Sequence, residues 1–253
     1  MGKEDSRALL MRGLGFLAIF LLGAFSCNRE STRMHAIPLR MLWAWESPQD
    51  LRFLTDGEGV AFLAGEMHFE GHSTRWQPRR NPLKVNPATP LMAVIRLESH
   101  SAVLDESQER ELVHRAMQCM KLPGVLGIQI DFDAVPSERS WYAQAVRRLR
   151  TTLPDKAPLT ITALGSWCWD DPWIDGLPAD EAVPMLFRMS AGESDIRRRL
   201  SRGEDVRVGL ASHSWGVSTD EPLPALKKGR RIYAFHPGSW TESAWQEIRE
   251  KLR

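Results

Sequence analysis

The alternation of apolar and polar residues along the chain predicts short strands separated by helices. The clearest strand is 124–135, which reads Gly-Val-Leu-Gly-Ile-Gln-Ile-Asp-Phe-Asp-Ala-Val. Successive side chains of a strand point to opposite faces. One face is therefore apolar and should pack outward against helices, through Leu126, Ile128, Ile130 and Phe132. The other face carries Gln129, Asp131 and Asp133 and should point to the interior.

Similar patterns predict seven further strands, at 41–46, 59–70, 91–98, 159–164, 182–189, 206–213 and 231–236. Helical spacing is found between most of them, at 105–120, 137–153 and 193–200, and after the last strand. The proline-rich stretch 71–90 should be an irregular loop without a helix. This order predicts the α/β class and a compact, somewhat irregular (β/α)8 TIM barrel in a single domain. A doubly wound open sheet is the alternative, but the chain contains neither G-x-G-x-x-G nor a P-loop.

The N-terminus has the pattern of an export signal. Three basic residues precede the apolar run 13–25, which is too short for an ordinary membrane span. The following Ser26-Cys27 resembles the cleavage site of a bacterial lipoprotein. We therefore expect a signal peptide at 1–27 with lipidation at Cys27, a periplasmic location, and membrane contact only through the lipid. A plain cleaved signal or an uncleaved tail is the alternative.

The remaining boundaries follow from the first strand. Residues 28–40 are expected to form a short linker and residues 41–253 the barrel domain. The two other cysteines, Cys119 and Cys168, fall at opposite ends of the predicted barrel, so both are expected to be buried and unpaired.

The charge of the chain limits its partners. Its 253 residues include 33 basic and 32 acidic side chains, a net charge of +1. Such a balance creates no field that would recruit nucleic acid. A carbohydrate or another small neutral polar ligand is the expected partner, and no cofactor or metal is predicted.

Polar and aromatic side chains gather where the predicted strands end, and TIM barrels place their active sites at that end. The candidates for binding are Trp45, Glu46, Glu66, His68, Glu98, Trp167, Arg188, His213, His236 and Trp240. Aromatic rings stack on the apolar faces of sugars, while carboxylates and arginine bind hydroxyl groups. A glycan site is therefore predicted, although tryptophans would equally suit the barrel core.

Asp131 and Asp133 are the catalytic candidates. They share one face of the central strand and stand about 6.6 Å apart by strand rise, close enough for one charge to raise the pKa of the other. Glycoside hydrolysis needs a protonated acid, together with a second carboxylate or the N-acetyl group of the substrate. The alternative is a structural ion network with Arg96 or Arg188.

Three segments, 127–133, 159–168 and 183–189, resemble a bacterial family of exported proteins of unknown function that are built like glycoside hydrolases. That resemblance extends over 41–240 and implies the barrel fold.

The central strand also resembles, more distantly, the D-G-x-D-x-D-x-E motif of chitinase-type glycoside hydrolases. Gly127 matches the motif glycine, Gln129 its middle Asp, Asp131 its last Asp and Asp133 its catalytic Glu. The resemblance implies that Asp133 is the acid and that Asp131 positions substrate. It also implies that Trp240 forms the floor of a sugar subsite and that Met185 and Phe187 replace a Met-x-Tyr pair.

Two other functions stay open. A non-catalytic glycan-binding lipoprotein would explain why Asp133, one methylene shorter, replaces the motif Glu, since this change withdraws the proton donor. A metal-dependent hydrolase could use Glu66, His68 and His72 with Asp131 or Asp133. No H-x-H or H-E-x-x-H motif supports the second possibility.

Overall fold

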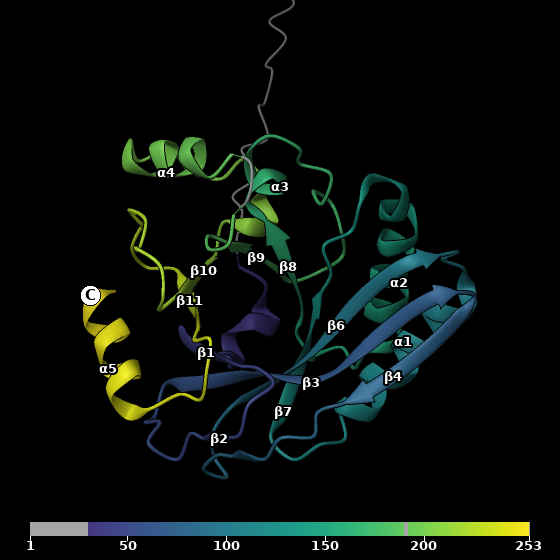
Figure 1. The fold of residues 1–253 in the computed structure, drawn as a ribbon, viewed down its shortest axis with the longest axis horizontal. Helices are drawn as coiled ribbons and strands as arrows, with labels where there is room; N and C mark the ends of the chain where they lie inside the picture. Colours follow the sequence, from purple (N-terminus) through teal and green to yellow (C-terminus); the bar gives the residue numbers. More distant parts are fainter. Residues whose placement is uncertain (1–29, 190–191, 253) are drawn as a thin grey trace, which may run out of the picture.

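The computed structural model describes residues 30–189 and 192–252. Eight parallel strands form a closed barrel (Figure 1). They are β1 (Arg40–Ala44), β3 (Glu58–Gly71), β6 (Leu91–Ala102), β7 (Val125–Asp131), β8 (Leu159–Leu164), β9 (Glu181–Met185), β10 (Ser214–Ser218) and β11 (Arg231–Phe235). Each pairs in parallel with its neighbours, and the β1–β3 pairing closes the ring. The predicted (β/α)8 TIM barrel is confirmed.

The signal peptide and Cys27 lie outside the described residues, so they stay predictions. Within the described ranges, no helix has the length and apolar character that crossing a bilayer requires.

The stretch 71–90, predicted as an irregular loop, contains two strands. β4 (Ser73–Pro78) pairs antiparallel with the second half of β3, while the first half of β3 pairs with β1. The short β5 (Leu83–Lys84) pairs with β2 (Gln49–Asp50). β3 can hold this extra partner because its 14 residues reach well beyond the end of β1.

The helices follow the predicted order. They are η1 (Thr32–Ala36), α1 (Glu106–Cys119), η2 (Pro136–Glu138), α2 (Arg139–Thr152), α3 (Gly165–Trp169), α4 (Glu193–Ser201), η3 (Gly209–Ala211) and α5 (Glu242–Lys251). Asp105 and Gln108 form a capping box that starts α1. No helix lies between β1 and β3, between β3 and β6, or between β10 and β11, all of which are described, so the barrel is irregular.

The seventh strand was predicted one segment too early. Residues 206–213 form a loop with η3, and β10 begins at Ser214. Inside β10, a Cβ on Gly216 would stand 2.8 Å from the Trp43 ring, so glycine is needed for the ring to lie across this strand. The apolar residues of the loop, Val208 and Ala211, are buried against the barrel instead. Burial without sheet pairing produced the same apolar pattern as a strand.

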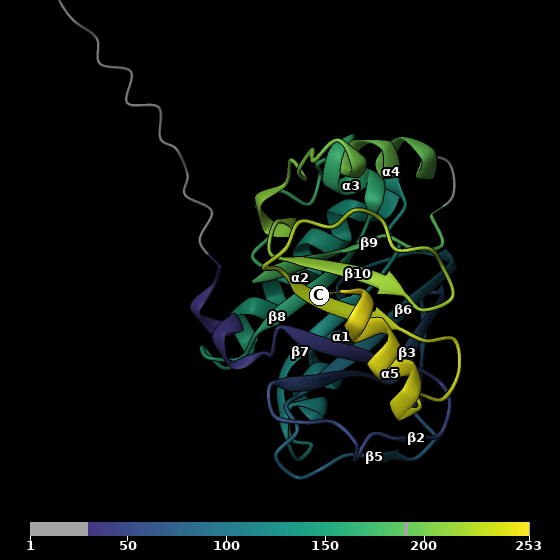
Figure 2. The same cartoon turned by 90° about the vertical axis from the view of Figure 1, so that its left-hand side faces the viewer.

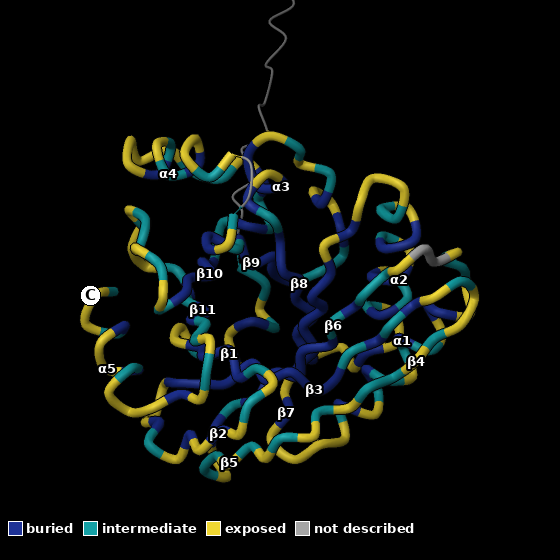
Figure 3. Tube along the Cα trace, viewed as in Figure 1, coloured by how far each residue is buried: buried dark blue, intermediate teal, exposed yellow. Residues whose placement is uncertain are grey.

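The two faces of β7 are divided largely as predicted. Ile128, Ile130 and Phe132 belong to the cluster under the helices. Gln129 points inward, where it accepts a hydrogen bond from Trp43 Nε1 at 2.7 Å and donates one to Thr160 at 3.1 Å. Leu126 differs from the prediction because it is 36% exposed. Figure 3 shows the central parts of the barrel strands as buried, whereas β4 is largely intermediate or exposed.

The cysteine prediction is confirmed. Cys119 and Cys168 are both free and buried.

Residues predicted as a linker close the end of the barrel at which the strands begin, which we call the base. Met34 of η1 and Ile37 are buried in the cluster inside the barrel. Arg231, the first residue of β11, donates to Met34 O and pairs with Glu30 at 2.7 Å. In Figure 2 this N-terminal segment lies at the base, on the left, while the strand arrows point to the right. Part of 28–40 is therefore an integral piece of the barrel.

Ile130→Ala should lower the free energy of unfolding by about 2–5 kcal/mol, because it leaves a cavity under the helices. Leu126→Ala, on the same face but exposed, is the matched control and should cost far less. Urea titration of both variants measures the difference. Equal losses would contradict the outward packing of Ile130.

Candidate active site

Two adjoining cavities open where the barrel strands end, and together they form one cleft. Their volumes are about 490 Å³ and about 400 Å³. Arg96, Asp131 and Asp133 line both of them. Asp131 is the last residue of β7, and Asp133 lies two residues further on, so the end of this strand supplies the boundary between the cavities. The cleft therefore lies at the end where TIM barrels carry their active sites.

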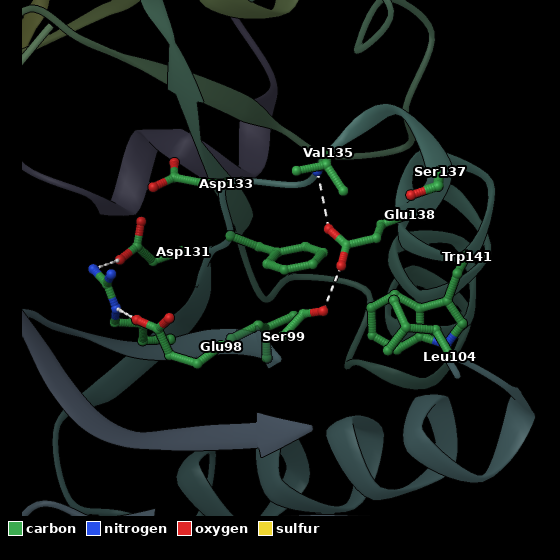
Figure 4. A pocket seen from close by; sticks show the side chains of 12 residues that line it. Glu98, Ser99, Leu104, Asp131, Asp133, Val135, Ser137, Glu138 and Trp141 are labelled. Carbon is green, nitrogen blue, oxygen red and sulfur yellow. Dashed lines mark hydrogen bonds and ion pairs between the residues drawn. The ribbon is translucent and has the colours of Figure 1, made fainter. Parts of the chain in front are cut away.

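The larger cavity has a polar wall. Glu98 and Ser99 of β6 face Ser137, Glu138 and Trp141, which lie at the start of the η2–α2 segment (Figure 4). Glu138 is held in place because it accepts hydrogen bonds from Ser99 Oγ and, at 2.9 Å, from Val135 N.

One arginine is shared by the carboxylates of the cleft. Arg96 binds Glu98 through Nε and Asp131 through Nη1, the latter at 3.2 Å. Asp131 also accepts a hydrogen bond from Thr162 at 2.7 Å, so each of its oxygens has a partner. Asp133 is exposed and makes no side-chain hydrogen bond or ion pair with the described residues. Asp131 is thus held, and Asp133 is free to meet a ligand.

The shared charge shifts the pKa values in this cluster. Burial raises the pKa of Asp131 above the ordinary 3.8, against the opposing effects of Arg96 and Thr162. Loss of hydration raises the pKa of Asp133 above the same value, and the negative charge of Asp131 adds to this. For Arg96, burial acts to lower the pKa, but the nearby carboxylates outweigh it and raise the pKa. Both carboxyl groups are therefore protonated more readily than an ordinary aspartate.

The smaller cavity is aromatic. Phe187 and Phe235 stack with their ring centroids 5.5 Å apart, and Trp45 meets Phe235 edge-on at 6.3 Å. Trp43 and Met185 also line it. Arg188 covers Phe235 at 5.0 Å and has a left-handed backbone with φ of 50°. A wall of aromatic rings beside a carboxylate pair suits a ligand with both apolar and polar faces, such as a sugar.

The structure brings only some predicted site residues to the cleft: Asp131, Asp133, Glu98, Trp45 and Arg188. Glu46 lies beyond it and accepts a hydrogen bond from Asn81. Glu66 and His68 pair with each other on the upper half of β3. His236 lines a separate small cavity next to α5.

Trp167 and Trp240 are placed in the core, which corrects their expected position at the cleft. They are only 2% and 4% exposed, and neither lines the two cavities. Trp167 packs edge-on against Trp173, and Trp240 packs against Trp245 while donating from Nε1 to Trp43 O. Their rings have no face open to a sugar.

The predicted position of His213 at the cleft is also wrong. Because β10 begins at Ser214, His213 precedes the strand and lies at the base, opposite the cleft. Burial lowers the pKa of His213.

The residues of the metal-hydrolase hypothesis do not meet. His72 pairs with Asp105, His68 with Glu66, and Asp131 with Arg96. Among the described residues, no three His, Cys, Asp or Glu side chains lie close enough to hold a metal ion.

Several cleft residues were not among the predicted site residues: Thr162, Ser166, Phe235, Ser99, Glu138 and Trp141. Thr162 could have been found from strand alternation, since it follows Thr160 on the inward face of β8. The contribution of η2 and α2 could not, because it depends on how the loop after β7 turns back over the cleft.

Fold and site together define a (β/α)8 barrel protein with an acidic and aromatic cleft at the carboxyl ends of its strands. Residues 87–185 match the family described as "Domain of unknown function (DUF3142)". The matched stretch runs from just before β6 to the end of β9 and includes Arg96, Asp131 and Asp133. The predicted resemblance to a family of unknown function with this fold is confirmed. No functionally curated protein matches the chain.

Solved structures with this fold include chitinase-type enzymes. A family GH18 chitinase from Chromobacterium violaceum has a TM-score of 0.50 at 11% identity, with 78% of each chain covered. The chitinase domain of the spore coat protein CotE from Clostridium difficile has a TM-score of 0.46 at 13% identity, covering 81% of this chain and 70% of that one.

The spore cortex-lytic enzyme SleL from Bacillus cereus has a TM-score of 0.46 at 16% identity. The match covers 76% of this chain but only 54% of the SleL chain, about half of its length. The likeness to the Chromobacterium violaceum chitinase, at 11% identity, establishes the barrel fold alone.

Proposed function

We propose that this protein is an exported, lipid-anchored, glycoside-hydrolase-like barrel that binds a glycan in the cleft and cleaves a glycosidic bond with Asp133 as the acid. The main observation in support is the position of Asp133. Its side chain is exposed, has no partner in the described part of the chain, and lies where a polar cavity meets an aromatic one. A sugar chain that crosses this junction would bring a glycosidic oxygen past Asp133.

The roles of the two acids differ because their environments differ. Asp131 is buried and holds Arg96 and Thr162 with its two oxygens, which supports a role in fixing the network and positioning substrate. Asp133 has a raised pKa and an open approach, which supports proton donation to the leaving oxygen as the C–O bond breaks. Water would then add to the anomeric carbon and return the proton. The N-acetyl group of the substrate could stabilise the cation formed in between.

The aromatic cavity supports glycan binding independently of turnover. Trp45→Ala should weaken affinity about tenfold, since it removes one stacking ring at the cavity wall. Trp76→Ala, a half-buried tryptophan on β4 that lines neither cavity, is the matched control. Calorimetry on a panel of short glycans would measure both. If the wild type binds no glycan of the panel, the proposal that its ligand is a carbohydrate is wrong.

A non-catalytic glycan-binding lipoprotein is the second candidate. It is favoured by the shorter reach of Asp133, and binding without release of reducing ends would identify it.

Turnover should depend on pH through Asp133. An acid must be protonated to donate, so the rate should fall as the pH rises through the raised pKa of Asp133. Initial rates on a cleaved glycan between pH 4 and pH 9 would measure this decrease in rate. A rate that rises with pH over this range would indicate that Asp133 acts as a base.

A further inference from the structure

Three leucines are exposed at the base of the barrel, the end opposite the cleft. Leu39, Leu122 and Leu126 are 56%, 45% and 36% exposed. Leu39 comes just before β1, Leu122 lies in the turn before β7, and Leu126 is the second residue of β7. They are three of the five exposed large hydrophobic residues in the described ranges. These side chains give the base apolar points that a bilayer surface could accept.

The chain also enters the barrel at the base, and it does so tightly. Glu30 pairs with the buried Arg231 at 2.7 Å. Ser31 donates to Asp180 at 2.6 Å, and Arg33 pairs with the same carboxylate at 3.0 Å. Asp180 directly precedes β9, so these contacts attach the segment to the starts of two strands. From Glu30 onward the chain is therefore fixed to the barrel by these contacts.

We propose that the base lies against the membrane and that the cleft faces away from it. The proposal rests on the proposed lipid anchor at Cys27, which lies outside the described residues. Only three peptide units separate Cys27 from Glu30, and they span at most about 11 Å. A lipid on Cys27 therefore holds the base, with its exposed leucines, at the bilayer surface.

This orientation restricts the substrate. The seven residues of β7 alone separate the base from Asp131 by about 20 Å. The cleft then opens away from the bilayer, where it meets a soluble glycan or a glycan polymer fixed at a distance. Headgroups of only one or two sugars on lipids of the same membrane are out of its reach.

The test uses the full lipidated chain on vesicles of phosphatidylethanolamine and phosphatidylglycerol that contain a headgroup-linked quencher. Lys121→Cys places a fluorophore on the base, beside Leu122, and Val103→Cys places one at the far end of β6. The native Cys119 and Cys168 are buried and should not label.

We expect strong quenching at position 121 and almost none at position 103. Equal quenching, or stronger quenching at position 103, overturns the proposal, as does failure of the wild type to bind the vesicles.

A flexible Gly-Ser insertion of about 20 residues between Cys27 and Glu30 is the control, since it extends the tether to roughly 25 Å. It should retain vesicle binding and lose the difference between the two probes. A difference that persists would overturn the role of the short tether. Binding of soluble glycans by the same labelled proteins is measured in parallel, so failure of the orientation and failure of the glycan function are distinguished.

Discussion

Asp133→Asn should lower the turnover of a cleaved glycan by about two to four orders of magnitude, the effect of losing a well-placed general acid. Affinity for the same glycan should change little, because the aromatic cavity and the Arg96 network are untouched. The measurement is release of reducing ends alongside calorimetric binding. Asp155→Asn, which removes an exposed carboxylate at the base, is the matched control and should leave both unchanged.

The same variant should be at least as stable as the wild type at pH 7. The folded-state pKa of Asp133 is raised, so between the unfolded and folded pKa values the folded chain binds more protons than the unfolded chain. Its contribution to stability is therefore present at low pH and is lost as the pH rises through the folded pKa. Asparagine carries no charge that burial could destabilise. Any gain in unfolding free energy of the variant over the wild type should therefore shrink as the pH falls toward 4. Unfolding of Asp133→Asn at pH 7 would show instead that the residue is structural.

Arg231→Met should cost about 3–5 kcal/mol of unfolding free energy, because it leaves the carboxylate of Glu181 buried without its cation. Arg231 and Glu181 are 2% and 0% exposed, and they are in direct contact. Burial already raises the pKa of Glu181 to about 7, so the interior penalises its charge even with Arg231 present. Urea titration at pH 8 measures the loss.

Two variants separate this cause from others. Arg40→Met changes an exposed arginine at the same end and should cost less than about 0.5 kcal/mol. The double variant Arg231→Met with Glu181→Leu removes both charges and should recover part of the loss. The recovery stays partial because Arg231 also donates to the carbonyls of Pro38 and Met34. A double variant no more stable than Arg231→Met would show that these backbone contacts, and not the buried charge, carry the effect.

The acidic half of the site was predictable from the sequence. Asp131 and Asp133 stand at the end of a strand whose period is unambiguous, and the end of a parallel strand is where barrels carry their sites. Glu98 and Trp45 were found by the same rule. The rule failed for His213, because Val208 and Ala211 are buried in a loop rather than in a strand. An apolar pattern reports burial, and only the pairing partners distinguish a strand from a buried loop.

The tryptophans show a second limit. Trp167 and Trp240 follow strands just as Trp45 does, yet their rings turn outward into the packing of α3 and α5. Whether a ring at a strand end lines the cleft depends on which way the following loop turns. That direction is decided by contacts with distant segments.

The sequence by itself determined that eight parallel strands form a barrel, although the seventh was placed too early, and it determined the inward face of β7 and hence the acid pair. These features depend on local periodicity and chain order. Only the tertiary structure decided that Arg96 and Thr162 hold Asp131 while Asp133 stays free. It also decided that Phe187 and Phe235 form the aromatic wall, and that residues 30–37 close the base. The physical reason is that each of these features requires contact between residues far apart in the chain, and the closure of the barrel fixes those distances.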